Sequence, residues 1–81
     1  MIIALTHMRN YQDHELARKV PDIDLILGGH DHVRMIEFPV IKSGDNFKSF
    51  SVIKVFKKGE NGDDCQYKGN NFDFSIELHY V

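Results

Sequence analysis

The chain has 81 residues, of which 42% are hydrophobic and 27% charged, and its formal net charge at pH 7 is −2. This length favours one domain or part of one, with a small core, because so short a chain buries only about 60% of its unfolded surface. Without a basic excess, the chain lacks the electrostatic footprint of a protein that binds polymeric nucleic acid. Its longest apolar runs fall far short of the roughly 20 residues of a membrane span. The single cysteine, Cys65, excludes an internal disulfide framework.

The first part of the sequence predicts a β-α-β unit. Residues 2–5 are all apolar and predict a strand that is buried on both faces. Residues 13–20 predict a short helix, with Asp13 as its N-cap and Pro21 ending it. Residues 24–27 predict a second buried strand. The two strands would form a parallel pair with a right-handed crossover.

Three histidines follow the ends of these two predicted strands. His7 comes just after the first strand, and His30 and His32 come after the second, behind Gly28-Gly29. Ligands gather at the carboxyl ends of parallel strands, so we expect His7 and His30 to lie close together. If the segment after the glycines is extended, His30 and His32 face the same side. Imidazoles in this arrangement suit zinc, manganese, iron or cobalt, and the glycines let the backbone approach a ligand. The alternative interpretation is that these are polar loop histidines without a function.

The rest of the chain has the pattern of antiparallel strands. We expect strands at residues 40–42 and 51–56, on either side of a turn at 43–46. Residues 57–71 are polar and predict a loop. Residues 72–80 alternate between apolar and polar side chains, which is typical of a half-buried antiparallel strand.

Other polar residues are better explained without a function. His14 is expected in the helix start and His79 on the last strand, and neither has the context of a metal ligand. Arg9 and Arg34 flank the histidine segments and could contact an anionic substrate, but solvated surface arginines are the favoured interpretation. Asp63-Asp64 lacks the ligand spacing of a calcium site.

One family shares these motifs. The run Ala4-Leu5-Thr6-His7-Met8, the run Ile23-Asp24-Leu25-Ile26-Leu27-Gly28-Gly29-His30-Asp31-His32 and the later Val40-Ile41-Lys42-Ser43-Gly44 resemble the calcineurin-like metallophosphoesterases, and most closely their 5′-nucleotidase branch. The resemblance implies an α/β fold that is part of a four-layer α/β/β/α sandwich, beginning with the β-α-β unit and continuing in antiparallel strands. Residues 1–81 would form the C-terminal half of the catalytic domain.

The resemblance also implies a metal centre. Two divalent ions, which could be Zn, Mn, Fe or Co, would sit at the end of the sheet. His7 and His30 would bind one ion and His32 the other. Asp31 occupies a position that varies in the family and receives no role.

Other motifs of the family are missing from the chain. The Asp-x-His, Gly-Asp-x-x-Asp and Gly-Asn-His motifs, which come before the Thr-His segment in the family, do not occur in it. We therefore expect no catalytic residue here, a phosphoester hydrolase in the intact parent, with 5′-nucleotidase-like dephosphorylation of nucleotides as the leading function, and little or no activity from these 81 residues alone. Since Met1 runs directly into a predicted strand, we expect a fragment whose Ile2, Ile3 and Leu25 are covered by a missing N-terminal half or a second copy.

Three alternatives remain open at this point. The chain is a non-catalytic metal-binding or interaction module, or it belongs to another metallophosphoesterase such as a cyclic-nucleotide phosphodiesterase, or it is a poorly folding piece whose exposed sheet edges aggregate. Motifs upstream of Met1, metal binding and gel filtration would separate these alternatives.

Overall fold

The computed structural model describes residues 1–46, 48–57, 67–68 and 74–80. They form an α/β fold of one helix and seven strands in the order β1 (Ile3–Leu5), α1 (Asn10–Lys19), β2 (Leu25–Gly28), β3 (Arg34–Glu37), β4 (Val40–Ser43), β5 (Ser51–Lys57), β6 (Tyr67–Lys68) and β7 (Phe74–Tyr80). The interpretations of Asp63-Asp64 and Cys65 lie outside the described residues. Among the helices of the described part, none is long and apolar enough to cross a membrane.

The first sheet has the strand order β1-β2-β4-β3. β1 pairs in parallel with β2, with Ile3 opposite Leu25, and β2 pairs in parallel with β4. This confirms the predicted β-α-β unit. The expectation that antiparallel strands follow it is wrong for the pairing of β4 with β2, and β4 and β5, which were expected on either side of a turn, lie in different sheets. β3, which the sequence did not predict, forms an antiparallel hairpin with β4. As a result, β4 lies between two strands that precede it in the chain.

The second sheet has the order β5-β7-β6 and is antiparallel. The predicted alternation in β7 is confirmed where its side chains are described. Ile76 and Leu78 are buried, Glu77 between them is partly exposed, and His79 is exposed. The two-residue β6 falls within the segment that was predicted to be a loop.

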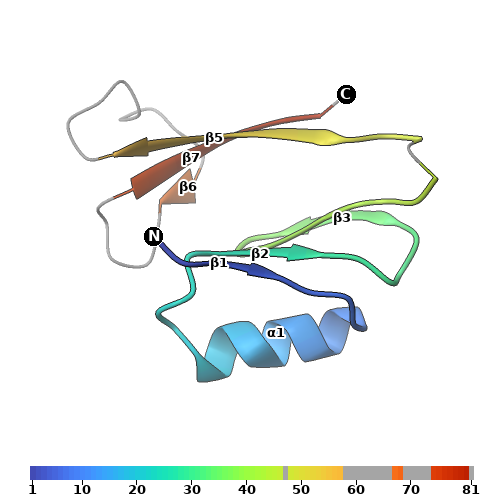
Figure 1. Ribbon diagram of the computed structural model, residues 1–81, viewed down its shortest axis with the longest axis horizontal. Coiled ribbons are helices and arrows are strands. Elements are labelled where there is room, and N and C mark those ends of the chain that lie inside the picture. The colour runs from blue at the N-terminus through green and yellow to red at the C-terminus, as the bar shows by residue number, and fades with distance from the viewer. Residues whose placement is uncertain (47, 58–66, 69–73, 81) are drawn as a thin grey trace.

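The elements stack in three layers, with α1 on one face of the first sheet and the second sheet on the other (Figure 1). Between the two sheets lies a core of Leu25, Ile41, Ile76 and Leu78. Between the first sheet and α1 lies a second cluster, formed by Ile23, Ile26 and Val40, against which Ala4, Leu16 and Ala17 pack. The central strands β2 and β4 are therefore covered on both faces.

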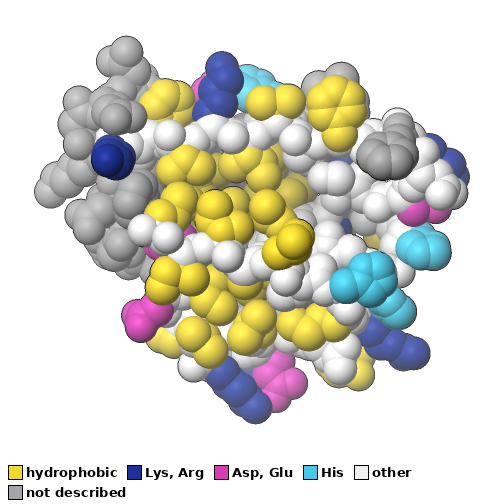
Figure 2. Space-filling view, in the orientation of Figure 1, with side chains coloured by type: hydrophobic (Ala, Val, Ile, Leu, Met, Phe, Trp, Pro, Cys, Tyr) yellow, Lys and Arg dark blue, Asp and Glu magenta, His cyan; other side chains and the backbone are white. Residues whose placement is uncertain are grey.

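β1 departs from its predicted burial. It pairs with β2 and has no second partner among the described strands, and Ile3 and Leu5 are 50% and 86% exposed. The expectation of a fully buried strand is wrong for this element, while the expected exposure of Ile2 and Ile3 is confirmed. Figure 2 shows hydrophobic side chains gathered on the face of the molecule that carries β1. Leu25 was expected to be poorly covered, but it is 1% exposed because the second sheet packs over it.

The helix starts three residues earlier than predicted. Its first residue is Asn10, and the Gln12 side-chain oxygen accepts a hydrogen bond from the Arg9 backbone N–H at 3.1 Å. This bond satisfies a backbone donor just outside the first turn. Asp13 is consequently not the N-cap; it lies inside the helix and is fully buried.

Candidate functional site

The segment of residues 29–33, which we call the histidine arch, crosses the carboxyl end of β4. It joins β2 to β3, and β4 lies between these strands. In the register of the sheet, Gly28 is opposite Lys42 and Arg34 is opposite Ser43. The arch must span two strand spacings, about 10 Å, and its residues can reach well beyond that. It is therefore an arch anchored in one sheet at both ends.

His7 and His30 come together at this end of the sheet, as the strand order predicts. A backbone hydrogen bond from Thr6 to Leu27 at 3.0 Å extends the β1–β2 pairing up to His7. The two imidazole rings meet edge to face, with centroids 5.5 Å apart and an interplanar angle of 85°. Both side chains are exposed, and Figure 2 shows histidine side chains gathered at the end of the molecule where β1 and β2 finish.

Gly29 leaves room for the His7 ring. A Cβ atom at position 29 would lie 3.0 Å from Nδ1 of His7. The Gly-Gly pair was expected to permit an unusual backbone path towards a ligand. Neither glycine has a positive φ; the left-handed angles belong to His30 and His32, with φ of 74° and 57°.

These left-handed angles change the expected geometry of the arch. His30 and His32 are not in an extended segment, so the argument that alternation places both imidazoles on one side is wrong. A left-handed non-glycine residue costs about 1–2 kcal/mol, and such strain persists where surrounding contacts enforce it. Within the described residues, no three His, Cys, Asp or Glu side chains are placed to hold one metal ion. The structure thus pairs His7 with His30 and leaves His32 outside a shared ligand group.

A buried ion pair lies directly beneath the arch. Lys42, on β4, is 2% exposed, and its Nζ lies 2.9 Å from Oδ2 of the fully buried Asp13. The Thr6 hydroxyl donates to Oδ1 of Asp13 at 2.6 Å. A Cβ at Gly28 would lie 2.8 Å from Cε of Lys42, so Gly28 makes room for this pair.

The Lys42 ammonium also reaches the histidine segments. It donates to the backbone oxygens of Met8 at 2.9 Å and Gly29 at 3.0 Å, and to the carboxylate of Asp31. An ammonium has three N–H groups, which are shared here among four acceptors. The contacts join β4, α1, the loop after β1 and the arch.

Charge in this cluster is set by these hydrogen bonds. Burial alone would lower the pKa of Lys42, but its hydrogen bonds to Asp31 and Asp13 outweigh burial and raise that pKa above its ordinary value. The hydrogen bond from Lys42 lowers the pKa of Asp31. At neutral pH the cluster therefore holds a cationic lysine beside an ionised Asp31.

Sequence reasoning missed this cluster, although one signal was available. Lys42 falls inside the predicted strand 40–42, next to the apolar Val40 and Ile41, and a lysine that is buried in a strand needs a compensating anion. The need for an anion indicates that Lys42 has an acidic partner, but the sequence does not show which residue it is. Asp13 was interpreted as a helix cap, and Asp31 received no role.

The other singled-out side chains lie outside the histidine arch or at its border. His14 lies 3.4 Å from Glu37, which also accepts a 2.9 Å hydrogen bond from Asn10. His79 lies 3.0 Å from Glu77 on β7. Arg34 begins β3 at the end of the arch, and its side chain is exposed.

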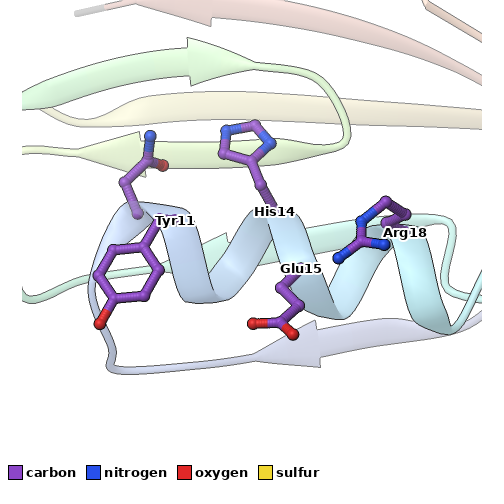
Figure 3. A pocket seen from close by; sticks show the side chains of 5 residues that line it. Tyr11, His14, Glu15 and Arg18 are labelled. Atoms are coloured by element: carbon purple, nitrogen blue, oxygen red, sulfur yellow. The ribbon is translucent and has the colours of Figure 1, made fainter.

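A shallow hollow lies on the outer surface of α1 (Figure 3), and it is lined by Asn10, Tyr11, His14, Glu15 and Arg18. All of these residues come from one helix. In Figure 3 Tyr11 and Glu15 point away from His14, so the side chains do not converge on a point. The hollow is a helix surface rather than a built site.

Comparison with known proteins gives one informative match. A 42-residue segment, 52% of the chain, is 50% identical to the trifunctional nucleotide phosphoesterase protein YfkN of Bacillus subtilis (strain 168). Over this segment the chain is similar to a nucleotide phosphoesterase. The match spans only 3% of the length of that protein. No family model matches the chain, and no solved structure matches it.

Proposed function

We propose that residues 1–81 form the C-terminal half of the catalytic domain of a metal-dependent phosphoester hydrolase that acts on nucleotides. We place it among the calcineurin-like enzymes, in the 5′-nucleotidase branch. Two observations support the proposal: the similarity to a nucleotide phosphoesterase, and the pairing of His7 with His30 at the carboxyl ends of β1 and β2. The α1 layer and the two sheets are compatible with part of an α/β/β/α sandwich.

The single observation that carries the proposal is the contact between His7 and His30. A zinc-bound imidazole nitrogen lies about 2.0–2.1 Å from the metal. Two rings whose centroids are 5.5 Å apart are therefore close enough to bind one ion after small rotations. We assign these two side chains to one divalent ion (Zn, Mn, Fe or Co) and His32 to a second.

The described residues fit such a centre in part. They provide a pair of imidazoles but no complete ligand set, so the remaining donors must come from elsewhere. Bound divalent ions would supply an activated water and stabilise charge on the phosphoryl oxygens. This chain contributes the histidine pair and the arch that presents it. Without the carboxylates that hold and bridge two ions, we propose that the isolated chain has little or no hydrolase activity.

Zinc titration followed by calorimetry tests the ligand assignment. The purified chain should bind at most one zinc ion weakly, since no more than two histidines converge among the described residues. His30→Ala should abolish this binding, and His79→Ala, which removes an exposed imidazole from β7, should leave it unchanged. Equal zinc binding by the wild type and His30→Ala would overturn the ligand assignment.

The enzyme assignment is tested by the transcript upstream of Met1. We expect a continuous reading frame that encodes Asp-x-His, Gly-Asp-x-x-Asp and Gly-Asn-His segments, and metal-dependent release of phosphate from nucleotides by the longer protein. A stop codon or unrelated sequence there would favour the alternative of a non-catalytic metal-binding module. Preference for cyclic nucleotides would move the proposal to a phosphodiesterase.

The exposed edge of the sheet at β1 is a site where another strand could pair. Ile2, Ile3 and Leu5 are half or more exposed, and β1 has only β2 beside it in the described sheet. We propose that a strand from an N-terminal half pairs with this edge, and that the isolated chain can use the same edge to form a homodimer. Light scattering after gel filtration should show dimers of the isolated chain, and a strictly monomeric chain at high concentration would contradict the dimer.

A further inference from the structure

We propose that Lys42 is a positioning residue that fixes the backbone next to His7 and His30 and so keeps their imidazole rings side by side. This inference rests on the proposed function, since it treats the two histidines as metal ligands. It assigns to the β4 lysine a task that the motif around the histidines does not reveal.

The contacts of Lys42 bracket both histidines. Its Nζ binds the carbonyl of Met8, the residue after His7, and the carbonyl of Gly29, the residue before His30. It also binds the carboxylate of Asp31, the residue after His30. One ammonium group therefore fixes the backbone next to each imidazole, and a shift of either segment would lengthen a hydrogen bond to the same atom.

The other neighbour of His7 is fixed through Asp13. The Thr6 hydroxyl donates to Oδ1 of Asp13, and Oδ2 of Asp13 pairs with Lys42. His7 is thus held on both sides, by the Thr6 side chain and by the Met8 carbonyl. Because Asp13 is fully buried in α1 and Lys42 is 2% exposed in β4, this network is anchored in the packed layers rather than in the loops.

The arch has few other contacts among the described residues, one of which is a hydrogen bond from the Asn10 backbone to the Asp31 carboxylate. His30 and His32 are exposed, so packing does not hold their side chains. Within the arch, the Asp31 backbone N–H donates a hydrogen bond to the Gly29 carbonyl at 2.9 Å. The left-handed angles of the two histidines need an enforcing contact, and the bonds to Lys42 provide one. Residues that orient metal ligands in this way typically change metal affinity by about 10–100-fold when they are mutated.

The test compares Lys42→Met with Lys54→Met, which removes an exposed lysine from β5. Two quantities are measured on the 81-residue protein: the NMR cross-peaks between the His7 and His30 rings without metal, and the zinc affinity. We expect Lys42→Met to lose the cross-peaks and to bind zinc about 10–100-fold more weakly. Lys54→Met should match the wild type. Unchanged cross-peaks and affinity in folded Lys42→Met would overturn the proposal.

Two further variants keep the test decisive if Lys42→Met does not fold. The double variant Asp13→Asn/Lys42→Met removes both buried charges at similar volume, and an asparagine oxygen can still accept from Thr6. Asp31→Asn weakens the links that this carboxylate makes to Lys42 and to the Asn10 backbone, and leaves the buried Lys42–Asp13 pair intact. Either folded variant should weaken the ring cross-peaks while amide shifts in β5 and β7 stay constant, a local effect that general destabilisation would not produce. Wild-type cross-peaks in both variants would refute the positioning role.

The two readouts separate the two proposals. If the wild-type rings are in contact but no zinc binds through His30, the ligand assignment fails, and the cross-peaks still decide the role of Lys42. If the wild type binds zinc through His30 and Lys42→Met binds it equally well with intact cross-peaks, the positioning role fails and the proposed function stands.

Discussion

Replacing Gly28 with alanine would place a methyl group against the buried ion pair. The new Cβ would lie 2.8 Å from Cε of Lys42 and 3.0 Å from Oδ2 of Asp13. Gly28 does not have a left-handed φ, so alanine fits the backbone without torsional strain. The effect of the substitution therefore reports on crowding of the Lys42–Asp13 pair alone.

The cost follows from how little room the pair has. Lys42 is 2% exposed and Asp13 is fully buried, so neither side chain can swing into solvent. Overpacking of this kind costs about 1–3 kcal/mol. If the pair separates, the cost rises towards the roughly 3–5 kcal/mol of a broken buried ion pair. Urea unfolding followed by circular dichroism should show a lower midpoint at an unchanged slope, and thermal unfolding a Tm lower by about 4–8 °C for each kcal/mol.

Gly29→Ala is the matched control. Its Cβ would lie 3.0 Å from Nδ1 of His7, but that side chain is exposed and can rotate away. We expect a stability change within about 0.5 kcal/mol, as for surface substitutions, together with loss of the contact between the His7 and His30 rings. If Gly28→Ala is as stable as Gly29→Ala, the explanation of Gly28 by the ion pair is refuted.

Three further outcomes are expected. Ile76→Ala, at a side chain with no exposed surface between the sheets, should cost about 2–5 kcal/mol in urea unfolding, and a loss below 1 kcal/mol would contradict the two-sheet core. Hydrogen bonding by Asn10 and His14 lowers the pKa of Glu37 below its ordinary value, so its contribution to stability is present above the unfolded-state pKa and is lost as the pH falls through the folded-state pKa. Acid titration of unfolding should therefore show a smaller loss of stability in Glu37→Gln than in the wild type, and identical acid profiles would argue against these bonds. Leu5→Ser, at an 86% exposed side chain, should leave the Tm nearly unchanged and reduce self-association in gel filtration, whereas a large fall in Tm would show that Leu5 is buried.

The elements that the sequence predicted are those with strong local signals. The first strands and the helix follow from short apolar runs and from Pro21, and β7 follows from the alternation around Ile76 and Leu78. β3 was missed because its four residues carry a charge at each end and hold their place through backbone pairing with β4. The start of the helix was misplaced because Gln12, rather than Asp13, accepts the hydrogen bond at its beginning.

In the candidate site, too, one feature could be predicted from the sequence and another could not. The closeness of His7 and His30 could be predicted, since it requires only that two parallel strands be neighbours. The role of Lys42 could not, because its partners Met8 and Gly29 are 34 and 13 residues away and meet it only when β4 lies between β2 and β3. That strand order depends on pairing between distant segments, which local sequence patterns do not encode.

The position of β4 between two earlier strands also determines when the histidine arch can form. A nascent chain that has reached Glu37 already contains His7, His30 and His32 but lacks the strand on which the arch rests. Until β4 enters the sheet, β2 and β3 have no common neighbour, and Asp13 has no buried cation to pair with. Closing such non-local pairings is slow compared with helix formation. The arch therefore takes its shape late in folding, in the same step that completes the sheet, and a translation product that stops before Val40 would carry all three histidines without the means to arrange them.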